Sequence, residues 1–432
     1  MPPGRAVPVR FACGEEPQDR EPGKPGQRQQ YPHDRHRSFP NRPGTGKVAQ
    51  DSVEAQQEPE YHERQRNPGA GDDCNAPSPQ RRPAQQPPHG QGLAEQGRGH
   101  HDQIRKDTRE TRNHFFHLIG GFLYNQKMSL VVVGSVAYDG VETPHGRVER
   151  MLGGAATYIA LSASYFTQTR IVAVVGDDFA QEDTDLLVSR GIDLEGLERV
   201  PGKTFFWAGK YTADMNDRVT LTTDLNVFAD FQPKLPESYQ NARYLLLGNI
   251  QPNLQRSVHD QMKHLRLGGG DTMNFWISDF REELLQTIRN WDFLLINDHE
   301  ARMLSGETNL RKAANRIMDM GPHTVVIKRG EYGAMLFRRD SFFIVPGYLL
   351  ENVFDPTGAG DCFAGGFIGH LAEHGFSLDG DHISRGMLSR AVIYGSVMGS
   401  FCCERFGVER FRTLTREEID GRFEEFRKFT SF

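Results

Sequence analysis

A glycine-rich segment between Asp355 and Phe367 holds the residues best suited to chemistry. Gly358 and Gly360 let the backbone bend closely around a ligand, and the helix expected to begin beside Asp361 presents unpaired N–H groups and the positive end of its dipole. Such a bend can hold an anion. The Asp361 carboxylate can accept a proton from a hydroxyl that lies against the same N–H groups. An anion cradle beside a carboxylate is what phosphoryl transfer to an alcohol requires.

A simpler interpretation of the same segment is structural. A glycine-rich turn followed by an aspartate is a common way to begin a helix, because the carboxylate can accept hydrogen bonds from the first N–H groups. Glycine-rich matches to functional motifs also have many false positives. The spacing alone leaves both interpretations open and favours the plain turn.

The segment resembles the signature of the ribokinase (PfkB) family, Asp-x-Thr-Gly-Ala-Gly-Asp-x-Phe-x-x-Gly, and every defining position is filled. The resemblance implies a kinase that moves the γ-phosphoryl group of ATP onto an alcohol. It implies that Asp361 is the catalytic base and lies against the acceptor substrate. It further implies that the amides of Gly358, Ala359 and Gly360 form an anion hole for the γ-phosphate.

Two pairs of residues match positions that bind metal ions or lie near the nucleotide phosphates in the family. Asn297 and Glu300 match its Asn-x-x-Glu element, which implies that Glu300 organises Mg²⁺ through water and that Asn297 lies near the nucleotide phosphates. Such oxygen ligands suit Mg²⁺, although these two residues alone equally describe a capped helix start. Asp355 and Thr357 match positions that help to bind a monovalent cation, which implies a possible K⁺ site.

Two glycine pairs complete the resemblance in order and spacing. Gly330 and Gly333, which follow Lys328, match the ATP-side Gly-x-x-Gly turn, and on their own they would be an ordinary hairpin turn. Gly153 and Gly154 match the N-terminal signature, in which the glycine pair approaches the substrate. With these, the resemblance spans nearly all of residues 128–432.

Asp139 matches the family's aspartate that grips substrate hydroxyls, and a carboxylate accepting two hydroxyl hydrogen bonds is a natural sugar ligand. A plain turn aspartate is nearly as good an explanation. The family usually places an asparagine soon after the glycine pair, where it contacts the sugar. Here the stretch Ala155–Tyr158 has none. This departure argues against ribose itself, and Tyr158 either stacks on a ring or, as we expect, packs in the core.

Residues 140–152 and 204–231 correspond to the β lid that closes over the substrate and in relatives often pairs with a second subunit. The resemblance therefore implies a possible homodimer through the lid. The lid is rich in aromatic residues, namely Phe205, Phe206, Trp207, Tyr211, Phe228 and Phe231. They would suit a nucleoside base, and core packing explains them equally well. We expect a sugar substrate ahead of a nucleoside.

An α/β scaffold is needed to bring these motifs together. After Pro233 apolar runs alternate with helical periodicity, which predicts a parallel sheet covered on both faces. The resemblance implies the ribokinase-like three-layer fold with a mainly parallel central sheet and a small β lid. The expected strands are Leu130–Val133, Arg170–Gly176, Thr204–Thr212, Arg218–Phe231, Tyr244–Gly248, Thr272–Ile277, Phe293–Ile296, Thr324–Ile327, Ala334–Phe337 and Ser341–Val345. The expected helices are Gly153–Phe166, Asp183–Arg190, Leu254–Leu265, Glu282–Asn290, Asp298–Leu304, Leu310–Met320, Asp361–Glu373 and His382–Cys402.

The first 127 residues differ sharply from the rest. Residues 1–112 contain only eight Val, Leu, Ile or Phe and are crowded with Pro, Gln, Arg and His. So little apolar surface cannot offset the entropy of ordering a chain, which predicts disorder. Because Met128 opens directly into an apolar run, our preferred hypothesis is that residues 1–127 resemble translated non-coding DNA and are not part of the native protein. A disordered regulatory tail is the alternative.

Charge and cysteine content narrow the partners and the compartment. Residues 128–432 hold 32 Lys and Arg against 41 Asp and Glu, which argues against nucleic acid as a partner. The five cysteines form neither a metal-ligand spacing nor an even disulfide framework, so a reducing cytoplasm is expected. No run of about 18 apolar residues occurs, so no membrane span is expected.

Two other classes of protein are alternatives to a kinase. A non-catalytic nucleotide- or sugar-binding regulator could use the same fold, but the complete glycine segment ending in Asp361 argues against it. A Rossmann dehydrogenase would need G-x-G-x-x-G after its first strand, and the stretch from Gly134 to Asp139 lacks it. The sequence therefore predicts a small-molecule kinase that uses ATP and Mg²⁺.

Overall fold

The computed structural model describes residues 129–375 and 385–431. The segment 1–127, for which the sequence predicts disorder, lies outside these residues. So does the beginning of the helix expected from His382, which the structure describes from Arg385 onward.

The larger sheet has nine strands in the order β13-β12-β11-β10-β9-β8-β1-β4-β5. Its strands are β1 Leu130–Val133, β4 Thr169–Val175, β5 Asp193–Arg199, β8 Tyr244–Leu247, β9 Leu267–Asp271, β10 Phe293–Asn297, β11 Thr324–Lys328, β12 Ala334–Phe337 and β13 Phe342–Val345. Pairing is parallel from β11 through β5, and the β12–β13 hairpin adds two antiparallel strands. The carboxyl ends of β9, β10 and β11 therefore meet at one edge.

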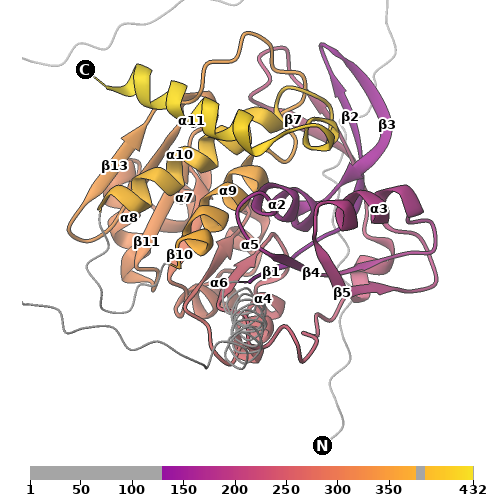
Figure 1. Ribbon diagram of the computed structural model, residues 1–432. Helices are drawn as coiled ribbons and strands as arrows, with labels where there is room; N and C mark the ends of the chain where they lie inside the picture. The colour runs from indigo at the N-terminus through magenta and orange to yellow at the C-terminus, as the bar shows by residue number, and fades with distance from the viewer. Residues whose placement is uncertain (1–128, 376–384, 432) are drawn as a thin grey trace, which may run out of the picture. The chain divides into compact units, whose positions relative to one another are not determined.

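Helices cover both faces of this sheet, which is the middle of three layers (Figure 1). One face packs against α2 Ala155–Ala163, α3 Gln181–Ser189, α9 Ala359–Glu373, α10 Arg385–Cys402 and α11 Arg416–Thr430. The other packs against α4 Pro252–Gln261, α5 Asn274–Asp279, α6 Arg281–Ile288, α7 Asp298–Ser305 and α8 Leu310–Asp319. Along β1, Leu130 and Val132 enter the first core, and Val131 and Val133 enter the second. Burial on both faces explains why such strands are continuous apolar runs.

A smaller sheet of four strands has the order β3-β2-β6-β7. Its strands are β2 Ala137–Thr143, β3 Gly146–Gly153, β6 Phe205–Tyr211 and β7 Arg218–Asp224. Strands β2 and β6 pair in parallel, and the other pairs are antiparallel. Because β2 follows β1 after only three residues, this sheet joins the large one directly beside the carboxyl end of β1.

Some expected elements were wrong. Thr272–Ile277, expected as a strand, is a loop followed by α5, and the true strand β9 is the glycine run before it. Gly269 and Gly270 occupy this strand because a Cβ there would lie 2.1 Å from Phe293 O or 2.2 Å from Leu247 O. The strand expected over Arg218–Phe231 ends at Asp224, where the 3₁₀ turn η1 (Asn226–Asp230) follows. Strand β5 and helix α11 were not predicted.

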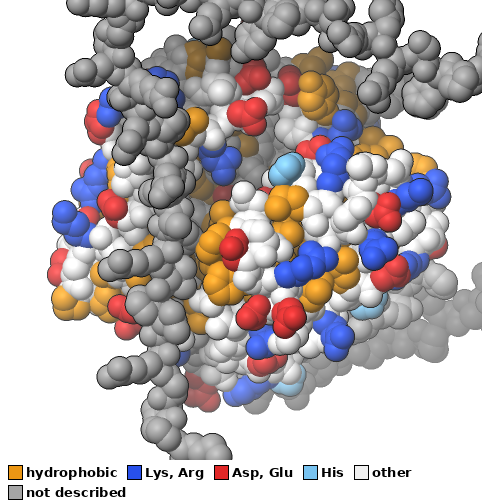
Figure 2. Space-filling model, turned by 180° about the vertical axis from the view of Figure 1, so that it is seen from behind, with side chains coloured by type: hydrophobic (Ala, Val, Ile, Leu, Met, Phe, Trp, Pro, Cys, Tyr) orange, Lys and Arg blue, Asp and Glu red, His pale blue; other side chains and the backbone are white. Residues whose placement is uncertain are grey.

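The described surface carries both signs of charge. On the face opposite to that of Figure 1, basic and acidic side chains are interspersed among apolar ones over the part that the structure describes (Figure 2). Among the described helices, none combines the length and apolar character needed to cross a bilayer.

Candidate active site

The glycine-rich segment forms a sharp turn into the N-terminus of α9. Gly358 is the N-cap residue with φ of +76°, a left-handed conformation that favours glycine. The N–H of Ala359 donates to Pro356 O (3.1 Å), so this amide is engaged within the turn. In the described residues, the N–H groups of Gly360 and Asp361 donate to no backbone carbonyl. Two amides at the start of α9 are thus available to an anion.

Asp361, in the first turn of α9, is within electrostatic range of two positive side chains from other elements. A Cβ on Gly360 would lie 3.1 Å from Lys328 Nζ, so the lysine at the end of β11 reaches the cradle. Burial raises the pKa of Asp361, and the charges of Lys328 and Arg218 lower it. Arg218 begins β7 of the small sheet. The carboxylate is therefore close to groups from both sheets.

The ends of three neighbouring parallel strands contribute the residues that the sequence predicted to lie near phosphate and metal. Asn297 at the end of β10 is the register partner of Lys328. Its side chain accepts from Glu300 N (2.8 Å), and its own N–H donates to Glu300 Oε2 (3.1 Å). The pair therefore forms a capping box at α7, as the simpler interpretation expected. Burial raises the pKa of Glu300, and the hydrogen bond from Asn297 N and the charges of Lys328 and Arg218 lower it. Its carboxylate is therefore within electrostatic range of Lys328.

Asp271, which sequence reasoning missed, belongs to the same group. It ends β9, is buried, and its Oδ1 has no hydrogen-bond partner. Burial raises its pKa well above the ordinary value, the charge of Asp361 raises it further and Lys328 lowers it. Its position at the carboxyl end of a parallel strand was the available signal, but the strand had been placed at Thr272–Ile277.

The half of the site that the sequence predicted to bind the acceptor is built around Asp139 in β2. The glycine pair lies against this carboxylate, since a Cβ on Gly153 would be 2.0 Å from Asp139 Oδ2. Gly154 has φ of +92° and begins α2. Burial raises the pKa of Asp139 to about 7, with contributions from the charges of Asp355 and Asp361. Asp139 is thus within electrostatic range of Asp361.

Tyr158 connects the two sides. Its hydroxyl donates to Asp139 Oδ2 (3.5 Å), and its ring fills the space beside Gly358, where a Cβ would lie 2.5 Å from ring carbons. The side chain is only 1% exposed. It therefore packs in the core, as expected, beneath both halves of the site.

The small sheet turns one face toward the site. Trp207 is the register partner of Asp139, and Arg218 that of Tyr211. The Tyr211 hydroxyl accepts from Thr357 Oγ1 (3.1 Å), and the Arg218 guanidinium lies 5.8 Å from the Trp207 ring. In contrast, Phe205, Phe228 and Phe231 stack on one another at 5.3 and 5.5 Å, so packing explains these three.

The loop containing Gly330 and Gly333 lies after β11 and touches the hairpin of the small sheet. The 3₁₀ turn η2 (Gly330–Tyr332) begins at the first of these glycines and ends just before the second. Glu331 within it accepts from Asn216 Nδ2 (3.2 Å), a residue between β6 and β7. The ATP-side turn predicted from the sequence is therefore joined to the small sheet.

Asp355 is fully buried and holds the segment in place. Its Oδ1 accepts from Thr357 N and its Oδ2 from Gly407 N, both at 2.9 Å. Burial raises the pKa of this carboxyl, and both hydrogen bonds lower it. A carboxylate has further lone pairs, so the arrangement is compatible with a cation but has a structural role without one.

Comparison with known proteins shows the family of the chain. Residues 127–413 match the family described as pfkB family carbohydrate kinase. The chain belongs to this family. A cytidine kinase of Thermococcus kodakarensis is 31% identical over 252 residues, which cover 56% of this chain and 87% of that protein. A nucleoside kinase of Methanothermobacter thermautotrophicus is 24% identical over 56% of this chain and 82% of its own length.

Solved structures share the fold. The nucleoside kinase of Methanocaldococcus jannaschii has a TM-score of 0.55 and 19% identity, over 69% of this chain and 98% of that one. A putative ribokinase II of Escherichia coli in complex with ATP and Mg²⁺ has a TM-score of 0.53 and 20% identity, over 69% and 99%. The predicted fold class is confirmed.

As a PfkB family member, the chain is a phosphotransferase that acts on a hydroxyl group of a sugar or nucleoside. Kinases of this family use ATP with Mg²⁺. The residues present fit that pair, because the buried, unpartnered oxygen of Asp271 and the Glu300 carboxylate are oxygen ligands of the kind Mg²⁺ prefers. Lys328 and the amides of Gly360 and Asp361 suit phosphate.

Proposed function

We propose that this chain transfers the γ-phosphoryl group of ATP to a hydroxyl of a nucleoside, with Asp361 as the general base. One observation carries the assignment of roles. Asp361 lies at the start of α9 within electrostatic range of Lys328 on the phosphate side and of Asp139 on the acceptor side. A base must be near both the attacking hydroxyl and the phosphate that it attacks.

In this mechanism Asp139 accepts hydrogen bonds from sugar hydroxyls, beside the backbone of Gly153 and Gly154. The Asp361 carboxylate takes the proton of the attacking hydroxyl, whose oxygen then bonds to the γ-phosphorus as the bond to ADP breaks. The amides of Gly360 and Asp361, which donate to no backbone carbonyl in the described residues, and the Lys328 ammonium hold the negative charge.

Glu300 and Asp271, with Asn297 nearby, would hold Mg²⁺ through oxygen ligands and water. The ion supplies charge neutralisation at the phosphates. We also propose that Asp355 and Thr357 take part in a K⁺ site. Burial of the Asp355 carboxylate supports this, since a cation would offset the cost of burying its charge.

A nucleoside is favoured over a free sugar by Trp207. Its register position beside Asp139 places an aromatic residue next to the proposed sugar-hydroxyl ligand. The curated relatives named above are cytidine and nucleoside kinases, which supports the same choice. A free sugar, which the sequence favoured first, is the second candidate. It is supported by a deoxyribokinase of Salmonella typhimurium that is 24% identical over 52% of this chain.

Replacing Asp361 by Asn tests the assignment of the base. Turnover should fall by about 10²-fold or more, the usual contribution of a positioned base. The dissociation constant of ATP should change less than about threefold, because the cradle remains. ADP release and ATP titration measure the two effects. Asp185→Asn, an exposed residue of α3, is the matched control, and turnover within twofold of wild type for Asp361→Asn would refute the role.

Replacing Trp207 by Ala tests the acceptor. Loss of a base-stacking ring costs about 1–3 kcal/mol, so KM for a nucleoside should rise roughly tenfold, and Trp207→Phe should restore most of it. An ADP-release screen across nucleosides, pentoses and hexoses gives the comparison. Phosphorylation of sugars without nucleosides would favour the second candidate, and ATP consumption with neither would support the non-catalytic regulator.

Three proposals concern the molecule beyond the site. Residues 140–152 and 204–231 form a lid, supported by the contacts of Tyr211 with Thr357 and of Asn216 with Glu331. A homodimer through this lid is supported by β3 and β7, the edge strands of the small sheet. A cytoplasmic location is supported by Cys362, Cys402 and Cys403, which are free thiols.

A further inference from the structure

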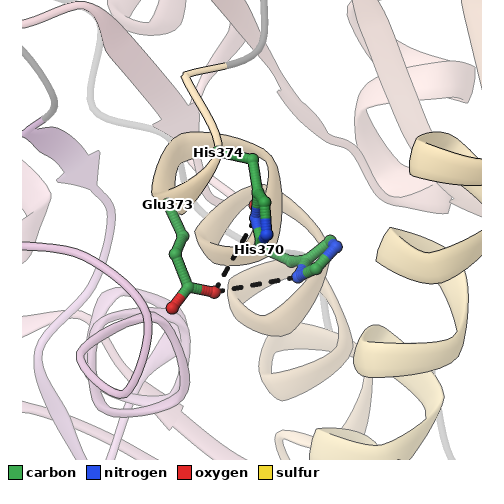
Figure 3. Close-up of side chains that lie close together, drawn as sticks. All are labelled: His370, Glu373 and His374. Carbon is green, nitrogen blue, oxygen red and sulfur yellow. Dashed lines mark hydrogen bonds and ion pairs between the residues drawn. The ribbon is translucent and has the colours of Figure 1, made fainter. Parts of the chain in front are cut away.

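A second cluster of ligand-type side chains lies near the carboxyl end of α9. His370, Glu373 and His374 are spaced i, i+3 and i+4, which brings them to one side of the helix (Figure 3). One donor atom from each side chain lies within 4.8 Å of the other two. His370 is nine residues from Asp361, which is about 14 Å along a helix. The cluster is therefore separate from the phosphoryl-transfer site.

His370 is the unusual member of this cluster. Its residue is only 3% exposed, and neither ring nitrogen has a hydrogen-bond partner. A buried polar group left unpaired is costly. Its ring is held in place by Tyr394, stacked at 4.5 Å, and by the edge of Phe166 at 6.4 Å. A neutral imidazole fixed in this way is a preorganised nitrogen donor.

We propose that His370, Glu373 and His374 bind a divalent transition metal ion, for which Zn²⁺ is the best fit. Glu373 Oε2 lies 3.8 Å from Nδ1 of His370 and 3.8 Å from Nδ1 of His374. Donors about 2.1 Å from a tetrahedral Zn²⁺ are roughly 3.4 Å apart, so small side-chain rotations close the site. Two imidazoles and one carboxylate leave a fourth position for water on the side of the partly exposed His374.

Existing contacts of the cluster compete with the ion and shape its selectivity. Arg416 donates to both Glu373 oxygens, at 2.9 and 3.2 Å, and His374 Nδ1 lies 3.0 Å from His370 O. An ionised carboxylate has about four lone-pair sites, so Glu373 can serve Arg416 and a metal together. The positive charge of Arg416 weakens binding of any cation. Because two of the three donors are imidazoles, the site suits metals with high affinity for imidazole better than Mg²⁺.

The expected effect is structural. Arg416 lies in α11, so the Glu373–Arg416 pair already joins the end of α9 to that helix. An ion bound to the same carboxylate would fix this junction and stabilise the folded chain, because a ligand that binds only the native state raises the midpoint of unfolding.

Calorimetric titration of the full chain with Zn²⁺ alone, compared between wild type and His374→Ala, tests the proposal. The chain has 16 His and 5 Cys, so Zn²⁺ can also bind elsewhere. The decisive result is therefore that the variant binds one equivalent of Zn²⁺ fewer than wild type. The Zn²⁺-dependent rise in Tm should shrink in parallel. Kinase activity should be unchanged in the variant, which separates this test from that of the proposed function.

The matched control is His323→Ala. His323 is exposed and lies 4.0 Å from a single carboxylate, that of Asp292, without a second imidazole. The His323→Ala variant should bind as many equivalents of Zn²⁺ as wild type. His370→Phe, which keeps an aromatic ring against Tyr394, should lose the same equivalent as His374→Ala. Equal Zn²⁺ stoichiometry in wild type and both cluster variants, or an anomalous-scattering map of Zn²⁺-soaked crystals with no peak among the three side chains, would overturn the proposal.

Discussion

At the scale of single residues, the site concentrates negative charge where water is scarce. Burial raises the pKa of Asp139, Asp271 and Asp361, and the charge of Asp361 contributes to the shifts of the other two. Lys328 lowers the pKa of Asp271 and Asp361. Perturbed carboxyls of this kind cluster at functional sites. Their grouping supports the assignment of this region more strongly than any one motif.

Asp139 should make the ligand-free protein less stable at high pH. Its pKa is about 7 in the folded state against an ordinary value of 3.8, so the folded state binds the proton more tightly. The stability gained by that proton is complete below about pH 4 and is lost as the pH rises through 7. By linkage the loss amounts to about 4 kcal/mol at most.

Asp139→Asn removes this dependence. At pH 8, without nucleotide, the free energy of unfolding of the variant should exceed that of wild type by about 2–4 kcal/mol, and near pH 4 the two should converge. Urea unfolding at both pH values measures the difference. Asp185→Asn, at an exposed position, should show no such divergence, and parallel pH profiles for wild type and Asp139→Asn would contradict the prediction.

At the scale of elements, β6 and β7 bring side chains from the small sheet to the cradle. Arg218 contributes to the lowering of the pKa of Asp361 and Glu300 and is the register partner of Tyr211, which contacts Thr357. An arginine here can neutralise phosphate charge. Sequence analysis did not identify Arg218, because its role depends on how β7 folds over the other sheet.

Arg218→Ala should lower turnover by about 10-fold to 100-fold and raise the KM for ATP, since one phosphate-neutralising charge is lost. Arg218→Lys should recover part of both, because it keeps the charge without the fork of donors. Steady-state kinetics with varied ATP measures the effect. Lys210→Ala, an exposed lid lysine paired with Glu142, is the control, and equal loss in Lys210→Ala would show that the effect belongs to the lid generally.

The sequence predicted elements well where burial and composition agree. The apolar runs of β1, β8, β10 and β11 were identified because strands buried on both faces contain few polar residues. Strand β9 was missed because its Leu-Gly-Gly-Gly-Asp run resembles a turn, and its glycines are explained only by the neighbours Phe293 and Leu247. Asp271 was lost with it. Whether such a glycine run forms a strand or a turn depends on contacts between distant segments, which the local sequence does not show.

Helix α11 had a local signal that was overlooked. Thr415 and Glu418 form a capping box at its start, and Thr-x-x-Glu before an amphipathic stretch predicts this motif. Its buried residues Ile419, Phe423 and Phe426 have the spacing i, i+4 and i+7. For the site, Asn297 and Lys328 come together because they end the neighbouring parallel strands β10 and β11. Asp139 and the Gly153–Gly154 pair are brought in by the small sheet, which begins three residues after β1.

At the scale of the whole molecule, the described residues contain the nine-stranded sheet with helices on both faces, and the small sheet beside it. The residues proposed for metal and phosphate lie at the ends of β9, β10 and β11 and at the starts of α7 and α9, and the proposed acceptor ligands lie in β2 and at the start of α2. Each group of the proposed mechanism is therefore supplied by residues after Met128.

Removal of residues 1–127 should leave catalysis intact. We expect kcat/KM within about twofold of the full chain, since none of the proposed ligands lies in that segment. Kinetics of the shortened chain, with the full chain as reference, provides the measurement. Intact mass of the native protein tests the related hypothesis that the segment is not translated. A large fall in turnover on removal would instead favour the regulatory tail.

Tyr158 limits how this enzyme can change its preferences. Its hydroxyl donates to the carboxylate proposed to select the acceptor, and its ring fills the space beside the turn proposed to hold the phosphate. A smaller residue at position 158 would make room for a bulkier acceptor, but it would also remove the ring that packs against Gly358. Adaptation to new acceptors is therefore easier from the Trp207 side, where a substitution can alter one partner and leave the other undisturbed.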